Sequence, residues 1–484
     1  MAVQKMAVRK RKAQDGMNRN ADKGRTGRIL AGLAGILLFG CLWGCGEADP
    51  QSFEPHLLEG TPITGQAERP ASEVSPAEEA LQPTAAESTP DAAETPAQVP
   101  VSAAAPQPAD DKPADDQPAD EEAPGSTEAP EITLIMVGDI LLHTPVEEAA
   151  LQPDGTRDFS PLFAHTSDLI AAPDLALVNQ EVIIGGEELG ISGYPAFNAP
   201  TQIGDALVDA GFDVVLHATN HALDKGKRGL ENCMAFWDEA YPEVEYLGIH
   251  DSEEDSREIF YYTEKGADPE EDLTVAILNY TYGTNGIALP ADMPYGVDLM
   301  DDAHRDRVEA QVREAQEHAD FVIVCPHWGT EYELGISSAQ RKWTKIFADC
   351  GADLIIGTHP HVIEPVEWAE SEETGDRALV YYSLGNFVNW TSGTGTGVAN
   401  RMVGGMARVT IGRDPESDMA VIKDYGVTAL VAHLEDGTGG VTVYPLREYT
   451  PELGEKNRIR SQDAAFSYDY CTDLCDRIWG SLWD

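Results

Sequence analysis

The stretch Gly351-Ala-Asp-Leu-Ile-Ile-Gly-Thr-His-Pro-His361 decides the fold, because a short apolar run ends in a glycine and then two histidines. Residues 354–356 have the apolar character of a buried strand. Pro360 disfavours a helix at His359, so we expect an extended segment with both imidazoles facing one cleft. In sheets built from β-α-β units, the carboxyl ends of the strands meet at one edge, where ligand sites form. The stretch therefore predicts an α/β fold with a ligand site at the strand ends.

Polar side chains of metal-binding or acid–base type follow other apolar runs of the chain in the same way: Asp139 after 132–138, Glu181 after 174–179, Asn220 and His221 after 212–216, and His327 after 321–325. Oxygen donors mixed with imidazoles suit Zn, Mn or Fe better than Ca or Mg. The recurrence indicates a metal-dependent hydrolase site.

Each motif also has an ordinary structural explanation. Asp139 and Asn220 could each cap a helix, and a lone histidine after a strand is more often a satisfied core or surface residue. Three histidines after two neighbouring strands are harder to explain in that way: His327, His359 and His361.

Catalytic and substrate-binding roles are predicted for the residues around these ligands. His221 is placed to act as a general acid on a leaving group, and Asp224 could orient its imidazole. Asn179 and Glu181 fall on the same side of an extended segment, where Glu181 could bridge two cations, or they are a turn-forming Asn and a solvated Glu. We also predict substrate binding by Asn179, Glu331 and Asn386. The Gly385-Asn386 pair fits equally well a site lining with backbone donors or a plain β turn.

The first 130 residues are predicted to form a leader and a linker. Residues 1–45 are basic and then apolar up to Cys45, as in a secretory signal that ends at a lipoprotein cysteine. An uncleaved signal anchor is the alternative, and either would tether the rest of the chain outside a bacterial cytoplasmic membrane. Residues 46–130 are rich in Pro, Ala, Asp and Glu and are predicted to be disordered. The net charge of −51 argues against a nucleic-acid partner.

From residue 131 onward, apolar strands alternate with amphipathic helices, the pattern of a layered α/β domain. We expect this domain to span 131–395. Residues 396–484 change to β alternation and then a short terminal helix, so we expect them to complete or flank a second sheet.

Six ordered motifs together resemble the CapA family of poly-γ-glutamate capsule biosynthesis proteins, over roughly residues 131–390: Gly138-Asp139, Asn179-Gln-Glu181, Asn220-His-Ala-Leu-Asp224, His327-Trp-Gly-Thr-Glu331, 351–361 and Tyr382-Ser-Leu-Gly-Asn-Phe387. This family looks like a branch of the calcineurin-like metallophosphatases, which implies a four-layer sandwich of two β-sheets flanked by helices. The resemblance implies that His221 is the acid. It also implies that one or two divalent transition metals (Mn, Fe or Zn) are held by Asp139, Glu181, Asn220, His327, His359 and His361.

The sequence departs from the phosphatase pattern at two ligand positions. The usual Asp-x-His opening is Asp139 with a histidine only at His143, and the bridging Asp is replaced by Asn179 or Glu181.

Two functions are consistent with these residues. The first is a cell-surface metal-dependent hydrolase of phosphoester type that takes part in the synthesis or export of poly-γ-glutamate. The alternative is a non-catalytic scaffold that binds the polymer or its membrane synthase complex. The histidines and asparagines at the strand ends count against a third possibility, an anchored solute-binding protein. The acidic chain would repel an anionic polymer unless cations bridge the two.

Overall fold

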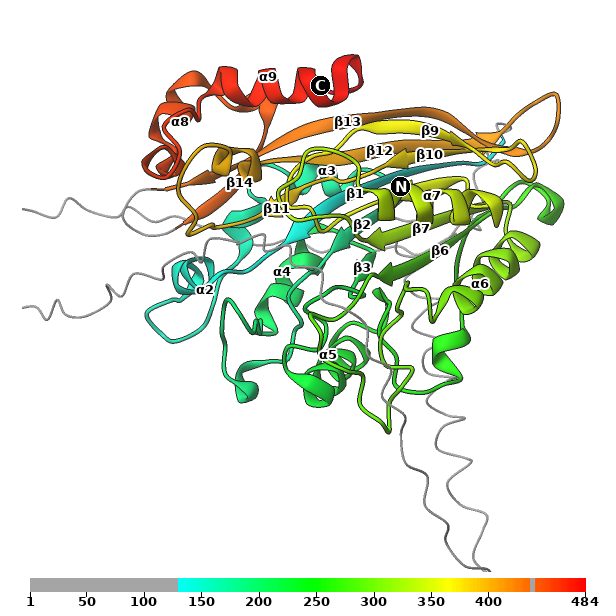
Figure 1. Cartoon of the computed structure of the whole chain (residues 1–484), viewed down its shortest axis with the longest axis horizontal. Helices are drawn as coiled ribbons and strands as arrows, with labels where there is room; N and C mark the ends of the chain where they lie inside the picture. Colours follow the sequence, from blue (N-terminus) through cyan, green and yellow to red (C-terminus); the bar gives the residue numbers. More distant parts are fainter. Residues whose placement is uncertain (1–128, 436–439) are drawn as a thin grey trace, which may run out of the picture. The chain divides into compact units, whose positions relative to one another are not determined.

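The computed structural model of the chain describes residues 129–435 and 440–484 (Figure 1). The predicted leader (1–45) and nearly all of the predicted linker (46–130) lie outside these residues, so both stay predictions. Among the helices of the described ranges, none is long and apolar enough to cross a membrane.

Two mixed β-sheets form the centre of the fold. The first has the strand order β14-β13-β12-β1-β2-β3-β4, with β11 paired to β1, and the second has the order β5-β6-β7-β8-β10-β9. The first sheet consists of β1 (Glu131–Ile140), β2 (Leu175–Asn179), β3 (Val214–Leu216), β4 (Glu245–Leu247), β11 (Asn386–Val388), β12 (Val403–Arg413), β13 (Ala420–Leu434) and β14 (Val441–Pro445). The second consists of β5 (Phe260–Glu264), β6 (Leu273–Thr281), β7 (Phe321–His327), β8 (Leu354–Ile356), β9 (Val366–Glu370) and β10 (Arg377–Tyr381).

Helices follow most of the parallel strands: α2 (Thr144–Ala150), α3 (Ser167–Ala171), α4 (Gln202–Ala210), α5 (Gly226–Ala240), α6 (Arg305–His318) and α7 (Ser338–Asp349), with α8 (Pro451–Lys456) and α9 (Tyr468–Trp479) near the end of the chain. The segment that precedes β2 is divided into a 3₁₀ turn, Ser160–Phe163, and α3. Thr166 ends the first turn, because its backbone N–H and its hydroxyl both donate to the carbonyl of Phe163.

Side-chain alternation along β6 reveals how the layers stack. Val275 and Ile277 pack in the large buried cluster that includes the strands of the first sheet. Ala276 and Leu278 point the other way, into a second cluster with residues of α6 and α7 such as Val308. One face of the second sheet therefore packs on the first sheet, and its other face is covered by these two helices.

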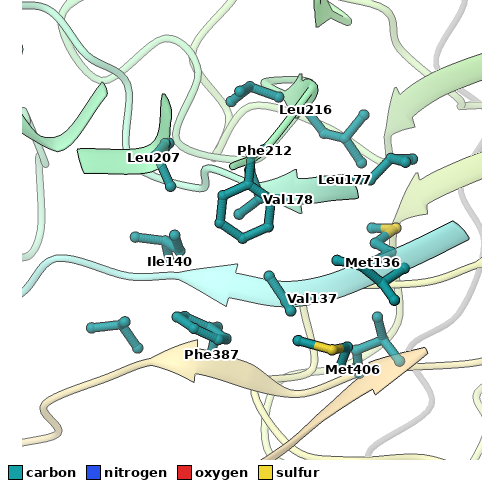
Figure 2. Packing of buried hydrophobic residues seen from close by; sticks show 14 of the residues in the cluster. Met136, Val137, Ile140, Leu177, Val178, Leu207, Phe212, Leu216, Phe387 and Met406 are labelled. Atoms are coloured by element: carbon teal, nitrogen blue, oxygen red, sulfur yellow. The ribbon is translucent and has the colours of Figure 1, made fainter. Parts of the chain in front are cut away.

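The central strands of the first sheet, β1, β2 and β3, are buried on both faces over most of their length, as strands of near-continuous apolar character require. Figure 2 shows Val137 and Ile140 of β1 between Phe387 of β11 and Val178 of β2, with Leu207 of α4 above them. Apolar residues of α3 and α5 belong to the same cluster. The predicted fold, an α/β sandwich of two sheets flanked by helices, is confirmed.

The last ninety residues complete the first sheet. Strand β12 runs antiparallel to β1 from Glu131↔Gly412 to Val137↔Met406, and β13 and β14 extend the sheet beyond it. On its other side β1 is parallel to β2, and β3 and β4 run in the same direction. Strands β6, β7, β8 and β10 are likewise parallel in the second sheet. Each sheet thus gathers the carboxyl ends of its parallel strands at one edge.

Candidate metal centre

Glycines let the backbone close tightly around Asp139 at the end of β1. A Cβ on Gly138 would lie 1.9 Å from the carbonyl oxygen of Gly385, so only glycine fits there. The N–H of Asp139 donates to that same oxygen (3.0 Å), and Asp139 pairs with Asn386 of β11. The Asp139 side chain is fully buried by this packing.

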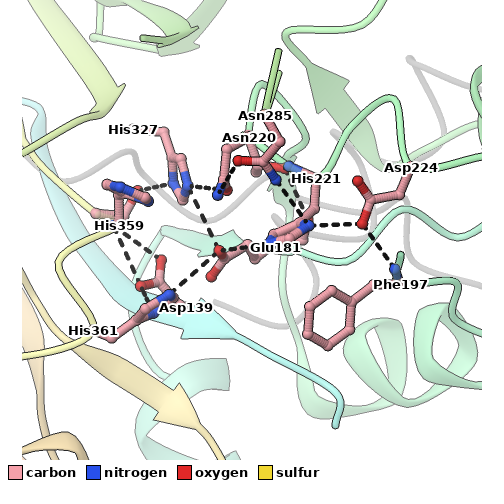
Figure 3. Close-up of polar contacts among 12 residues, drawn as sticks. Asp139, Glu181, Phe197, Asn220, His221, Asp224, Asn285, His327, His359 and His361 are labelled. Atoms are coloured by element: carbon pink, nitrogen blue, oxygen red, sulfur yellow. Dashed lines mark hydrogen bonds and ion pairs between the residues drawn. The ribbon is translucent and has the colours of Figure 1, made fainter. Parts of the chain in front are cut away.

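Glu181 lies at the centre of the site, just after β2. Its carboxylate is fully buried, and neither oxygen has a hydrogen-bond partner among the described residues. Its Oε1 is 3.6 Å from Nε2 of His361, 3.8 Å from Nε2 of His327 and 4.0 Å from Nε2 of His221 (Figure 3). Burial raises the pKa of Glu181 well above its usual range, although the charge of His361 opposes this effect.

Two sets of three buried ligand atoms share the Glu181 carboxylate. One set is Glu181, His327 and His359, and the other is Asp139, Glu181 and His361. Within each set all ligand atoms lie within 4.8 Å of one another. Nδ1 of His359 is also buried and has no hydrogen-bond partner among the described residues. Buried polar atoms without partners are costly unless they bind something. The residues therefore fit a divalent metal ion, and Glu181 is common to both sets.

The imidazoles come from the second sheet. His327 ends β7, with its Nδ1 3.0 Å from the hydroxyl of Thr358 and its Nε2 3.0 Å from Oδ1 of Asn220. Burial, reinforced by the neighbouring histidines, holds the pKa of His327 and of His359 well below the usual value. Both rings are therefore neutral at physiological pH, the form that binds a metal ion.

His361 differs from the other two histidines in its charge. Burial disfavours its protonated form, but the carboxylates of Glu181 and Asp139 outweigh this and raise the pKa of His361 to about 9. Its Nδ1 lies 3.1 Å from Oδ2 of Asp139 and 3.0 Å from Oδ1 of Asn386. A divalent cation held by the same carboxylates would compete with this proton.

The His-Pro-His segment is not extended, so that expectation is wrong. His359 has φ 99° and His361 has φ 58°, both in the left-handed half of the map. This backbone directs the N–H of His359 at the Asp139 carboxylate, 3.3 and 3.4 Å from its two oxygens. Positive φ is unfavourable for a residue with a Cβ, and such residues concentrate at functional sites. The local strain is offset by contacts with the other sheet.

His221 and Asp224 form a hydrogen-bonded pair beside Glu181. Nδ1 of His221 is 2.7 Å from Oδ2 of Asp224, which also accepts from the N–H of Phe197 (2.8 Å). The edge of the Phe197 ring packs on the His221 imidazole at 4.7 Å. A donated Nδ1–H fixes the ring so that its other nitrogen faces Glu181 (Figure 3). This is the arrangement of an oriented acid or base.

The three predicted substrate-binding residues lie in different surroundings. Asn179 is fully buried and donates to Oδ1 of Asp139 (2.9 Å), and Asn386 is buried against His361. Both therefore contact predicted metal ligands directly. Glu331 is exposed, in the loop after β7. No contact in the structure tests the substrate-binding role of these three residues, which stays a prediction.

Sequence reasoning missed two residues that touch the site. Asn285 is exposed and has φ 52°; its Oδ1 accepts from Nδ2 of Asn220 (3.3 Å), and its Nδ2 lies 3.3 Å from Nδ1 of His221. Tyr282 places its ring 4.7 Å from that of His359. The Asn-Gly pair at 285–286 is a turn signal in the sequence. That signal does not reveal which site the turn contacts.

Comparisons with known proteins give a consistent family. Residues 133–391 match the family described as bacterial capsule synthesis protein PGA_cap. The chain is 29% identical over 274 residues to the capsule biosynthesis protein CapA of Bacillus anthracis, a match that covers 54% of this chain and 62% of that protein. It is 28% identical over 270 residues to the PGA biosynthesis protein CapA of Bacillus subtilis (strain 168), covering 53% of this chain and 63% of that protein. The match thus spans less than two thirds of either relative.

Solved structures show a more distant likeness. A phosphatase of Mycoplasma pneumoniae is 13% identical, with a TM-score of 0.34, and covers 63% of this chain and 95% of its own. The calcineurin-like phosphoesterase YfkN from Bacillus subtilis is 14% identical, with a TM-score of 0.33, and covers 62% of this chain and 91% of its own. The assignment rests instead on the sequence match over more than half of the chain. The chain belongs to the PGA_cap family of bacterial capsule synthesis proteins.

Proposed function

We propose that the protein is a metal-dependent hydrolase of phosphoester type that takes part in making or exporting a poly-γ-glutamate capsule polymer at the cell surface. The observation that carries this proposal is the pair of buried ligand sets sharing Glu181, with the His221–Asp224 pair beside them. A scaffold alone has no need for an oriented acid next to buried, unpartnered ligand atoms.

The metal-holding residues would be Asp139, Glu181, His327, His359 and His361, with Oδ1 of Asn220 adjacent to His327. A divalent ion bound there supplies Lewis acidity, which polarises a phosphoryl oxygen and lowers the pKa of coordinated water. Asn179 and the N–H of His359 both donate to Asp139 and hold its carboxylate in place. The His359 and His361 rings are fixed by the left-handed backbone that carries them.

His221 is proposed to give a proton to the leaving oxygen. Its Nδ1 is hydrogen-bonded to Asp224, so the proton available for transfer is the one on Nε2, on the side of Glu181. The hydrogen bond to the Asp224 carboxylate keeps the His221 ring from rotating. The Phe197 ring and N–H complete this support.

The names of the relatives support the capsule part of the proposal, and the predicted leader supports a position outside a bacterial membrane, as a lipoprotein at Cys45 or through an uncleaved anchor. The polymer, a phosphoester substrate and membrane synthase subunits are the partners we propose. Because the chain carries a net charge of −51, cations would have to bridge it to an anionic polymer.

Metal content and turnover together test the proposal. We would measure metals by elemental analysis in wild type and in a His359→Ala, His361→Ala double variant, and hydrolysis of a phosphodiester by both. We expect one to two equivalents of Mn, Fe or Zn in wild type, with metal and turnover lost in the variant. His433→Ala is the matched control, because this buried histidine hydrogen-bonds Tyr449 (2.8 Å) and belongs to neither ligand set.

A His221→Asn variant separates catalysis from metal binding. It should keep its metal and lose turnover, since it removes only the proton donor. Metal-loaded wild type with no turnover on phosphodiesters, phosphomonoesters or γ-linked peptides would contradict a hydrolase and favour the scaffold. Wild type that takes up no metal after incubation with each ion would do the same.

A further inference from the structure

An arginine that no sequence motif singled out lies beside the metal centre. Arg401 belongs to a 3₁₀ turn, Val398–Met402, beyond the range matched by the family. Its guanidinium carbon is 3.5 Å from the centroid of the Tyr332 ring, whose other neighbour is the ring of His361 at 5.9 Å. The backbone carbonyl of Arg401 accepts from Asn386 (3.0 Å), which also contacts His361. Both the side chain and the backbone carbonyl of Arg401 thus contact a neighbour of His361, one of the predicted metal ligands.

The charge of Arg401 is not neutralised by a carboxylate. Among the described residues it forms no ion pair, although the chain has 84 Asp and Glu against 33 Lys and Arg. Of the five N–H donors of a guanidinium, only one on NH1 has an acceptor among these residues, the hydroxyl of Thr391 (2.7 Å). Its Nε is buried without a partner. In so acidic a protein, a half-buried arginine with free donors is an unusual feature that a bound anion would explain.

The position of Arg401 is fixed by the C-terminal part of the chain. The carboxylate of Asp463 accepts from the N–H groups of Gly397 (2.9 Å) and Ala399 (3.2 Å), at the start of the same turn. The Tyr332 ring lies under the guanidinium and keeps its plane in one orientation. Such a fixed, planar fork matches the two oxygens of a carboxylate or phosphate.

The electrostatic effect of Arg401 reaches the site. The pKa of His143 is lowered to about 4, by burial first and then by the positive charges of His361, His221 and Arg401. His143 itself packs on Phe197, the ring that supports His221. The arginine, the predicted acid and the predicted ligand are thus all close enough to act on the charge of His143.

We propose that Arg401, stacked on Tyr332, binds an oxyanion of the substrate, a carboxylate or a phosphate, beside the metal centre. The inference rests on the proposed function and adds the chemical class of the substrate: a molecule that presents a carboxylate or a phosphate group to Arg401. Tyr332 is 44% exposed, so this anion can approach from solvent. The positive charge of the arginine would attract a polyanion to this part of an otherwise acidic domain.

Anion binding to the full chain tests the proposal. We would titrate inorganic phosphate and a γ-linked glutamate trimer by calorimetry into wild type, Arg401→Gln and Arg401→Lys, and measure the metal content of each. Arg401→Gln should weaken one or both probes by roughly 10- to 100-fold, the usual range for a lost charged hydrogen bond. Arg401→Lys should recover only part, because an ammonium cannot make the two-pronged contact.

Arg377 offers a matched control. It stacks on Trp368 at 4.6 Å, but at the amino end of β10, opposite the edge that carries the site. Arg377→Gln should bind both probes as wild type does.

The two probes identify the source of the oxyanion. Weaker phosphate binding alone would assign Arg401 to the phosphoryl group, and weaker trimer binding alone would assign it to a carboxylate. Unchanged binding of both probes to Arg401→Gln, or no binding of either to wild type, would overturn the proposal. Loss of metal in Arg401→Gln would also overturn it, by making the residue structural. If wild type contains no metal, the proposed hydrolase function is contradicted instead, and the anion titration still tests the role of Arg401.

Discussion

Substituting Gly138 by alanine should disturb both stability and metal binding, through one contact. The added Cβ would lie 1.9 Å from the carbonyl oxygen of Gly385, and ordinary contact begins at about 3.4 Å, so the two backbones must separate by about 1.5 Å. The nearest atoms belong to the backbone and not to a flexible side chain, and Gly138 has no positive φ, so the substitution adds a clash but no strain in φ. The Asp139 N–H donates to that same oxygen over 3.0 Å and would lose its acceptor.

The size of the effect follows from these two terms. Overpacking of a tight interior costs about 1–3 kcal/mol, and an unsatisfied buried N–H costs about 1–3 kcal/mol more. We therefore expect Gly138→Ala to lower the free energy of unfolding by roughly 2–6 kcal/mol, against the usual total of about 5–15 kcal/mol. The protein should still fold, with Asp139 displaced from His361 and metal affinity reduced roughly 10- to 100-fold.

Urea unfolding followed by tryptophan fluorescence, together with metal titration, measures both effects. Gly283→Ala is the control, because a Cβ at Gly283 meets nothing within 4 Å and the position has no positive φ. The control should change the free energy of unfolding by less than about 0.5 kcal/mol. A Gly138→Ala protein as stable as this control, with wild-type metal affinity, would refute the role of the close backbone approach.

Asp224→Asn should lower turnover roughly 10- to 100-fold with metal content unchanged, because His221 loses the carboxylate that orients it. A variant that turns over substrate as fast as wild type in steady-state kinetics would contradict this role. His250 lies between Asp298 (2.7 Å) and Asp255 (3.2 Å), and these carboxylates outweigh burial and raise its pKa to about 9. The folded state thus binds this proton more tightly than the unfolded state does. Protonated His250 therefore stabilises the fold by up to ~3 kcal/mol; this stabilisation is complete below about pH 6.5 and is lost as the pH rises through 9. Urea unfolding from pH 6 to 10 should show this loss in wild type and not in His250→Asn, and an equal loss in both would be evidence against it. Removing the metal with a chelator should lower the free energy of unfolding. The expected decrease is about 2.7 kcal/mol relative to protein in which the free ion is at 100 times its dissociation constant. Adding the metal back should restore the stability, and an unchanged unfolding curve would contradict a bound ion.

The ligand positions could be predicted because they depend on strand ends. Apolar runs identify β1, β7 and β8 in the sequence, and parallel strands necessarily bring their carboxyl ends together. Asp139 is the last residue but one of β1, His327 is the last residue of β7, and His359 follows β8 after a short turn, so their convergence could be expected without knowledge of the loops. The same reasoning predicted that Glu181, after β2, and Asn220, after β3, lie at this edge.

The missed strands are those whose sequence lacks the apolar signal. Strand β5 has one buried residue, Tyr262, and β9 is an edge strand with none. Strand β11 is only three residues long and exists because Asn386 and Val388 pair with β1. Short or half-exposed strands are set by their partners in the fold, which local periodicity does not encode.

The backbone of the His-Pro-His segment illustrates a second limit. The rule for residues before proline excludes a right-handed helical conformation at His359, and extended structure is then the usual outcome. Here the contact with Asp139, 220 residues earlier in the chain, selects a left-handed conformation instead. Arg401 and Tyr332 were missed for a related reason, since their meeting depends on loops with no characteristic spacing.

The two sheets supply different kinds of ligand, and this division has a consequence for stability. The carboxylates Asp139 and Glu181 belong to the first sheet, and all three imidazoles belong to the second. An ion held by both kinds of ligand therefore joins the two sheets at the edge where the sandwich has the most buried polar groups. Asn279 of β6 makes a similar connection nearby, since its side chain accepts from Ala218 of the first sheet (2.8 Å) and donates to Cys325 of the second (2.8 Å).

A metal ion bound at this site would therefore couple to the fold through the sheet interface. Removal of the metal leaves Glu181 buried without a partner, a cost that the protein can reduce by protonating that carboxylate or by letting the sheets separate locally. Hydrogen exchange after chelation should distinguish the two responses. Faster exchange confined to the ends of β2, β7 and β8 would indicate separation of the sheets at this edge, and unchanged exchange would indicate that protonation alone absorbs the loss.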